Sequence, residues 1–398
     1  MALRFERGAT VSPERTGAMT VVRAETRRRW LIVAAVTAVL CALPAAIGAI
    51  PAGTIRIATS TLAARIAASA RQPYQANAVA TGSVGIPVLP ELADVADLFD
   101  GTTSLRIWYA SPQRWRVDSL GTAGERDVYQ GIYQEQAAQT IWDSGPGQLT
   151  TVIGSTPARL PRGTDLAPPD LARRLLAAAS GTTAMSALPA RRVGGISAAG
   201  LRLTPSEPQT TIGYVDIWAD PRTGLPLEVA VVPVGASSPA LVSRMLEVSM
   251  TAPGTSVTTA PQPSASVGSY VTDNPDVYTT LLDLGLGPLP RTLAGLPRID
   301  RGLGALPGIA AYGKGFAQLV ALSVPGRPGI QVLEGAIAAG TERTSGDGIS
   351  AVVTTSLLNV LLVHASGEPD TVIVVGLVTP DVLAAAANEL MAYESRLK

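Results

Sequence analysis

The sequence predicts an α+β fold in which two parts built on antiparallel strands follow one N-terminal membrane helix. Three observations support this prediction. One uncharged apolar stretch lies near the N-terminus, short alternating runs separated by Gly and Pro turns fill most of the chain, and few segments have helical spacing. Apolar residues make up 46% and charged residues 16% of the 398 residues, which is typical of a folded chain.

The predicted membrane helix covers residues 30–50, which carry no charge and are long enough to span about 30 Å of hydrocarbon. Residues 1–29 hold seven Arg and three Glu, so the positive-inside rule predicts a basic cytoplasmic tail. A cleaved secretory signal is the alternative, because small residues such as Ala46 and Gly48 can form a cleavage site. We expect a single-pass protein of the cell membrane, with the bulk of the chain extracytoplasmic.

The first extracytoplasmic part is predicted over residues 54–250. Helical spacing indicates a short helix over 61–71, and Pro168-Pro169 begin a helix over 170–179. Alternating runs predict an antiparallel meander and then a second group of strands. These runs cover residues 104–110, 115–120, 126–130, 140–144, 148–153, 199–204, 214–219, 227–234 and 241–250. Asp220–Gly224 is a hairpin turn, since Pro presets one dihedral angle and Gly supplies a positive one.

The remainder is predicted to form a linker and a smaller α+β domain. Residues 251–269 are rich in Pro, Ser and Thr and have no apolar period, which is typical of a linker or a long surface loop. Residues 270–398 form the second domain. Its predicted strands cover residues 316–324, 349–355, 357–364 and 371–378. An amphipathic helix over 380–396 follows, with Thr379 as its N-cap.

Three motifs together resemble a known family. Ser111–Val117, Gln139–Asp143 and Asp216–Pro226, in this order, resemble the LolA/LolB-like lipoprotein-carrier fold, which the N-terminal domain of the RseB/MucB-type sigma-E regulators shares. The resemblance covers roughly residues 72–250. Gly313–Phe316 and Val378–Pro380 are similar to the small C-terminal domain of RseB-like proteins, so the architecture is closest to the RseB/MucB type.

The resemblance implies an unclosed antiparallel β half-barrel whose concave face is plugged by helices, with a hollow that accepts acyl chains. Trp108, Trp115, Trp142 and Trp218 all fall in predicted strands, and inward-facing Trp residues would line such a hollow. They are therefore the candidate ligand-binding residues. The alternative is that they fill the core, because strand position alone does not set which face a side chain takes.

Composition and motifs exclude several kinds of chemistry. One Cys and one His form neither an intrachain disulfide nor the usual Cys/His zinc site. The single histidine, His364, is interpreted as a strand-end residue without a catalytic part, and Asp94, Asp97 and Asp100 as a solvated helix face. No phosphate-binding loop occurs. We predict no enzyme, no cofactor and no metal site, and 31 basic against 31 acidic residues argue against a nucleic-acid partner.

Two functions remain after these exclusions. The first is a membrane-anchored module that binds a lipid or a lipoprotein acyl chain at the outer face of the membrane. The alternative is an RseB/MucB-like regulator that binds an anti-sigma factor or another membrane protein in envelope signalling, with lipid as a signal. A third and weaker hypothesis is an envelope protein accessory to a transporter. The sequence alone does not choose among them.

Overall fold

The computed structural model describes residues 29–34, 37, 55–86, 93–121, 124–154, 161–262, 268–272, 288–299, 308–345 and 347–394. The chain divides into two units, Met1–Pro51 and Ala52–Lys398. In the first unit, residues 29–34 and 37 are helical. The predicted span over 30–50 lies mostly outside the described residues, so it stays a prediction. No helix within the described ranges is long and apolar enough to cross a membrane.

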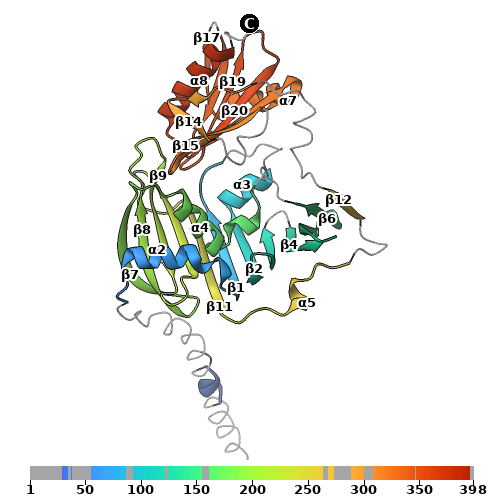
Figure 1. Cartoon of the computed structure of the whole chain (residues 1–398), viewed down its shortest axis with the longest axis vertical. Helices are drawn as coiled ribbons and strands as arrows, with labels where there is room; N and C mark the ends of the chain where they lie inside the picture. Colours follow the sequence, from blue (N-terminus) through green and yellow to red (C-terminus); the bar gives the residue numbers. More distant parts are fainter. Residues whose placement is uncertain are drawn as a thin grey trace, which may run out of the picture. The chain divides into compact units, whose positions relative to one another are not determined.

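A twelve-stranded sheet forms the first part of the second unit (Figure 1). Its strand order is β12-β6-β5-β4-β3-β2-β1-β11-β10-β9-β8-β7. The strands are β1 (Tyr74–Gly82), β2 (Thr102–Ser111), β3 (Arg114–Gly121), β4 (Gly124–Tyr133), β5 (Gln136–Asp143), β6 (Gln148–Ile153), β7 (Ala184–Val193), β8 (Ile196–Thr204), β9 (Ile212–Ala219), β10 (Pro226–Pro233), β11 (Leu241–Ser249) and β12 (Gly268–Thr272).

The predicted meander is confirmed, since β2 to β6 are antiparallel neighbours in chain order. The hairpin at Asp220–Gly224 also joins two antiparallel strands, and Gly224 has φ +75° there. One correction concerns the strand directions, because β12 runs parallel to β6 and the sheet is mixed. The reason is that β12 reaches the edge after a long connection from β11 and not through a hairpin.

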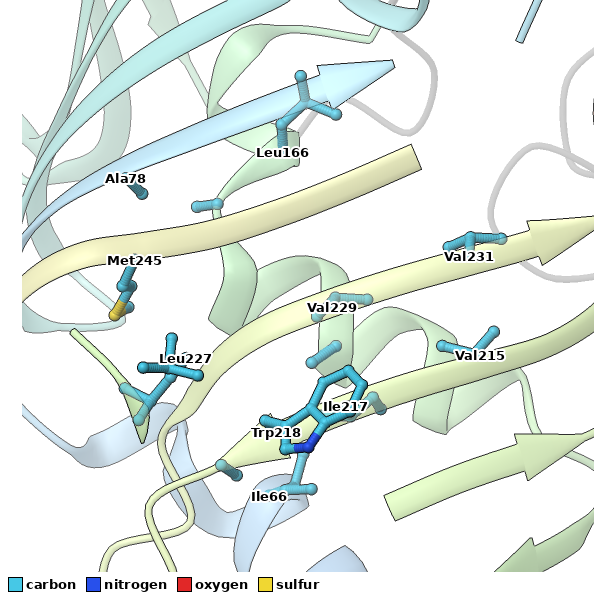
Figure 2. Packing of buried hydrophobic residues seen from close by; sticks show 14 of the residues in the cluster. Ile66, Ala78, Leu166, Val215, Ile217, Trp218, Leu227, Val229, Val231 and Met245 are labelled. Carbon is cyan, nitrogen blue, oxygen red and sulfur yellow. The ribbon is translucent and has the colours of Figure 1, made fainter. Parts of the chain in front are cut away.

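Helices cover one side of the β7 to β10 strands. The predicted helices are confirmed as α2 (Thr59–Ala68), which continues into η1 (Ser69–Arg71), and α4 (Pro168–Ala178). Further short helices are α3 (Ala93–Asp100), η3 (Gly163–Leu166) and α5 (Thr255–Thr258). Ile66 of α2 is fully buried in one cluster with Ile217 and Val229 of neighbouring strands, as Figure 2 shows. Apolar burial of this kind is the main source of stability in the domain.

An eight-stranded antiparallel sheet with the order β13-β14-β15-β16-β20-β19-β18-β17 forms the second part. Its strands are β13 (Thr292–Leu293), β14 (Leu296–Ile299), β15 (Ile309–Lys314), β16 (Ala317–Pro325), β17 (Thr341–Ser345), β18 (Gly348–Val353), β19 (Asn359–Ala365) and β20 (Asp370–Gly376). Helix α8 (Pro380–Glu394) packs with Leu361, and α7 (Gly326–Ala339) packs with Leu362. Because successive strand residues point to opposite faces, one helix covers each face of this sheet. The predicted α+β class is confirmed.

Hydrogen bonds join the two sheets through the start of β9. The Thr210 hydroxyl lies 3.1 Å from the carbonyl oxygens of both Phe316 and Leu377. The Thr211 hydroxyl donates to the Leu357 carbonyl at 2.5 Å. Both threonines are buried, so these contacts are shielded from water. Within the predicted linker over 251–269, the structure has α5 and the first residues of β12, and the division into domains at this segment stays a prediction.

Candidate functional site

Cross-strand register decides which side chains of the β2 to β6 meander share a face, because directly paired residues point the same way. Two rows of paired residues define what we call the Arg116 face. The first row is Trp108, Arg116, Tyr129, Thr140 and Thr151, and the second is Arg106, Asp118, Asp127, Trp142 and Leu149. The alternate residues, such as Ile107 and Val117, lie in the main hydrophobic core. The meander therefore has one core face and one face rich in aromatic and charged groups.

A compact ion cluster occupies the centre of the Arg116 face. The Arg116 guanidinium donates to Asp118 from Nε at 2.5 Å and from Nη2 at 2.8 Å, and from Nη2 to Asp127 at 3.0 Å. The same guanidinium lies 5.0 Å from the Trp108 ring centroid and 4.9 Å from that of Tyr129. Rings at this distance stabilise a cation through their quadrupoles. The cluster thus holds Arg116 by hydrogen bonds and between aromatic rings.

Asp127 is a buried carboxylate of this cluster that is incompletely hydrogen-bonded. It is 6% exposed, and its Oδ1 has no hydrogen-bond partner among the described residues. Burial and the neighbouring negative charge of Asp118 raise the pKa of Asp127 to about 6, although the Arg116 charge opposes the shift. Oxygens of Asp118, Glu125 and Asp127 lie within 4.8 Å of one another. The Arg116 guanidinium already supplies a cation there, so we assign the cluster a structural role.

A groove of about 710 Å³ lies beside this cluster, between the meander and residues that follow β11. We call it the β12 groove. The meander contributes Ser111, Gln113, Arg114, Tyr129, Gln130, Gly131, Ile132, Tyr133, Ala138, Thr140, Leu149 and Thr151. The opposite wall consists of Thr258, Thr259, Ala260, Pro261, Gln262, Ser269, Tyr270 and Val271. This volume is within the range of roughly 300–1,000 Å³ that ligand sites have.

The lining of the β12 groove is almost uncharged. Among the described residues that line it, Arg114 is the one charged residue, and amides, hydroxyls and aromatic rings supply the rest of the polar character. Ile132 on β4 is 75% exposed, and Tyr270 on β12 is 46% exposed. Exposed apolar side chains beside a concavity are typical of interaction sites. Neither residue was among the predicted site residues, and Gly268–Thr272 has no alternation of apolar and polar residues that would predict a strand.

The space between the helices and β7 to β10, by contrast, is filled. Leu62 and Ile66 of α2 are 1% and 0% exposed, and Leu201 and Ile217 of the facing strands are 0% exposed. These side chains form one continuous cluster (Figure 2). This is the place where the family resemblance implies a hollow for acyl chains. In the described residues it has the packing of an ordinary core.

The structure brings only two of the four candidate Trp residues to one face. Trp108 and Trp142 lie on the Arg116 face, and Trp108 also lines a shallow hollow of about 450 Å³. Trp115 pairs with Tyr109 and contacts the core clusters on the opposite face. Their role in ligand binding stays a prediction.

Trp218 lies apart from the other three, in the β7 to β10 half of the sheet. It is 5% exposed, and its Nε1 donates to the Pro189 carbonyl at 3.2 Å. The Arg191 guanidinium lies 3.5 Å from its ring centroid and forms an ion pair with Glu228. Burial raises the pKa of the Glu228 carboxyl, and the Arg191 charge opposes this. These partners surround the indole as they would in a packed core.

His364, the single histidine of the sequence, lies near the end of β19. Its Nδ1 is 3.1 Å from the Asp370 carbonyl oxygen and 3.2 Å from the Thr371 hydroxyl. Both partners belong to the neighbouring strand β20. The ring therefore bonds within the sheet, as a strand-end residue does.

Comparison with known proteins gave solved structures alone, since no family model and no curated protein matches. The chain is similar to a structure of the Pseudomonas aeruginosa MucA/MucB complex, with a TM-score of 0.43, 17% identity, and coverage of 83% of this chain and 96% of that chain. A structure of MucB gives a TM-score of 0.40 with 16% identity, again over 83% and 96% of the two chains. A LolA superfamily protein from Nitrosomonas europaea gives 0.24 with 11% identity, over 52% and 99%.

These similarities agree with the families that the sequence motifs resemble. The similarity to MucB extends over 83% of the chain, and that to the LolA superfamily protein over 52%.

Proposed function

We propose that this chain is a non-enzymatic binding protein of the cell envelope that holds an extended polypeptide segment of a membrane protein in the β12 groove. The extracytoplasmic part of an anti-sigma factor is the kind of partner that the sequence resemblance implies. The observation that carries the proposal is the groove itself, which runs beside β6 and the edge strand β12 and has an almost uncharged, mixed polar and aromatic lining.

The chemistry of the lining favours a polypeptide. The amide side chain of Gln113 and the hydroxyls of Thr140 and Thr151 can hydrogen-bond to peptide groups, while aromatic rings accept apolar side chains between them. Extended peptides are commonly recognised by such a combination of sheet-edge hydrogen bonds and alternating side-chain pockets. An acyl chain offers no hydrogen bonds, so it would leave these polar groups without partners if it excluded water from them.

A lipid or lipoprotein acyl chain is the second candidate. The specific observation in its favour is the volume of about 710 Å³, together with the apolar side chains of Ile132 and Leu149. The half-barrel hollow and the binding role of the four Trp residues belong to this candidate. It is the weaker of the two candidates. The space between the helices and the sheet is filled by a packed core, so an acyl chain would have to bind in the groove, whose polar groups it cannot hydrogen-bond.

The cellular place of the protein is part of the proposal. Residues 30–50 anchor the chain, residues 1–29 lie in the cytoplasm, and residues from about 54 onward are extracytoplasmic. An anchored binding protein and a membrane-bound partner diffuse in the same plane. Their effective concentration is then higher than in free solution, so a modest intrinsic affinity suffices.

A site-specific crosslinker distinguishes the two candidates. A photoreactive amino acid replaces Ile132 in the groove of the full chain, and in a control chain it replaces Met185, which is 40% exposed on β7 at the other edge of the sheet. After irradiation in native membranes, the mass of each adduct identifies its class. We expect a polypeptide adduct from position 132 that position 185 does not give. An acyl-chain adduct from 132, or the same adducts from both positions, contradicts the proposal.

A further inference from the structure

Among the described strands of its sheet, β12 alone has no antiparallel neighbour. Its five residues pair with β6 in the parallel sense, from Gly268 opposite Gln148 to Thr272 opposite Val152. It is the terminal strand of the sheet order, so among the described strands it has a neighbour on one side only. Its side chains are exposed, with Tyr270 at 46% and Val271 at 49%. Figure 1 shows β12 beside β6, at the edge of the meander.

We propose that Gly268–Thr272 is a placeholder strand that the bound segment of the partner replaces on β6. The partner would thus bind by strand exchange at this edge. The proposal rests on the proposed function and specifies how the same site is controlled. It makes the edge of β6 the primary contact, with the β12 groove receiving the side chains of the incoming strand.

Strand β6 is held firmly in the sheet, so its outer edge stays in place whether or not β12 is bound to it. Leu149 and Val152 are each 4% exposed, and the opposite edge of β6 is fully paired with β5. Without β12, the outer edge would present unpaired N–H and C=O groups, which act as a template for another strand. Any occupant of this edge must therefore supply an extended backbone.

Strand β12 is bound to the sheet less strongly than β6 is. Parallel pairing is slightly less stable per residue than antiparallel pairing, and exposed side chains contribute little apolar burial. Elements with few buried contacts open at low free energy. The preceding helix α5 is better fixed, because it contacts β2, β3 and β4 and its Thr258 is 4% exposed. We therefore expect β12 to leave locally while α5 stays in place.

The placeholder indicates the chemistry of the strand that replaces it. Its sequence, Gly-Ser-Tyr-Val-Thr, is uncharged and combines an aromatic with β-branched residues. The six residues of β6 are also uncharged. A charged segment would find Arg114 as its one charged partner among the described residues that line the groove. The expected occupant is an uncharged extended segment of about five residues that runs parallel to β6. Its arrival also removes Ser269–Val271 from one wall of the β12 groove, which widens the groove.

Two variants of the full chain test the exchange, both with Cys41 replaced by Ser. The locked variant carries Thr150→Cys and Tyr270→Cys, which are register partners, so oxidation ties β12 to β6. The open variant carries Tyr270→Pro and Val271→Pro. Adjacent N–H groups of a strand point to opposite sides. The two prolines therefore remove the N–H group that bonds to β6, whether it belongs to residue 270 or to residue 271. The probe is a fluorescent synthetic peptide of residues 264–276, and the control peptide has proline at the same two positions.

We expect the open variant to bind the probe at least about tenfold more tightly than the native chain, in which β12 competes at an effective concentration in the millimolar range. The oxidised locked variant should bind no more probe than control peptide, and reduction should restore native binding. Equal binding by the open and native chains overturns the exchange. If circular dichroism shows that the open variant does not fold, the test is the difference in probe binding between the oxidised and the reduced locked chain.

The same locked chain separates this inference from the proposed function. With the photoreactive residue at position 132, partner capture should fall on oxidation. If a polypeptide is captured equally in both states, the proposed function stands and the exchange is wrong. If the probe exchanges as expected but position 132 captures no polypeptide, the exchange stands and the proposed function is wrong.

Discussion

Replacing Trp218 by Ala tests whether this residue fills a core or lines a ligand hollow. The indole is 5% exposed, so nearly its whole side chain would be removed from a packed site. Substitutions of buried Phe or Trp by Ala cost about 3–5 kcal/mol, because a cavity replaces the lost contacts. Arg191, whose side chain is 45% exposed, would also lose the ring beneath its guanidinium, a contact of roughly 0.5–1 kcal/mol at an exposed site. We therefore expect a loss of about 4–5 kcal/mol in the free energy of unfolding.

Urea titration followed by far-ultraviolet circular dichroism measures this loss. Trp142→Ala is the matched control, because Trp142 is only partly buried on the Arg116 face and should lose about half as much. A residue that lined a hollow would leave little new cavity when truncated. A Trp218→Ala chain within about 1 kcal/mol of the native stability would therefore refute the packed-core reasoning.

Three further predictions concern charge, the junction of the sheets and topology. The folded pKa of Asp127, about 6, lies above its ordinary value of 3.8, so the folded state holds the proton more tightly and stability falls as pH rises from about 4 to about 6. Thermal melts across this range should show that Asp127→Asn reduces the fall, whereas Asp143→Asn, on the neighbouring strand β5, should keep it. Thr210→Val removes the hydroxyl between the two sheets, so two buried carbonyl oxygens lose their hydrogen bond to it. The free energy of unfolding should therefore drop by about 1–3 kcal/mol in urea titrations. An unchanged value would contradict the role of this junction. A C-terminal reporter that is active only outside the cytoplasm should be active on the full chain, and activity of a cytoplasmic reporter there would overturn the predicted orientation.

The sequence was most informative where the signals are local. The meander followed from alternating runs and Gly turns, and the hairpin at Asp220–Gly224 from turn residues alone. Several strands were not predicted, and β1 and β7 are two of them. β1 alternates buried and exposed positions with Ala in the buried ones, and Ala is a weak marker of a strand. β7 contains Pro189 beside a register irregularity and is mostly exposed.

Helix α7 was missed for a similar reason. It begins with Gly326-Arg327-Pro328-Gly329, a composition that is typical of loops. Its apolar face becomes meaningful only against the sheet, where Leu333 and Ala336 pack with Leu362. Tertiary burial thus overrides the local preference of these residues.

The candidate site was harder to predict than the fold. The four Trp residues were correctly assigned to strands, but their faces depend on register. Trp108 and Trp115 fall on opposite faces because the β2–β3 hairpin pairs Trp108 with Arg116 and Tyr109 with Trp115, and a slip of one residue would invert this. The β12 groove depends on a contact of residues 258–262 and 269–271 with the distant meander, which no local pattern encodes.

The affinity of the captured segment for groove variants tests the central claim most directly. Once the polypeptide that crosslinks to position 132 is sequenced, a synthetic peptide of that segment can be titrated against three full chains: native, Ile132→Asp and Met185→Asp. A charge at position 132 would be covered by the bound peptide, and it should weaken binding at least about tenfold, since an unpaired carboxylate is costly to desolvate. The same charge at position 185, at the far edge of the sheet, should leave the affinity unchanged. Equal affinities for all three chains would contradict the placement of the partner in the β12 groove.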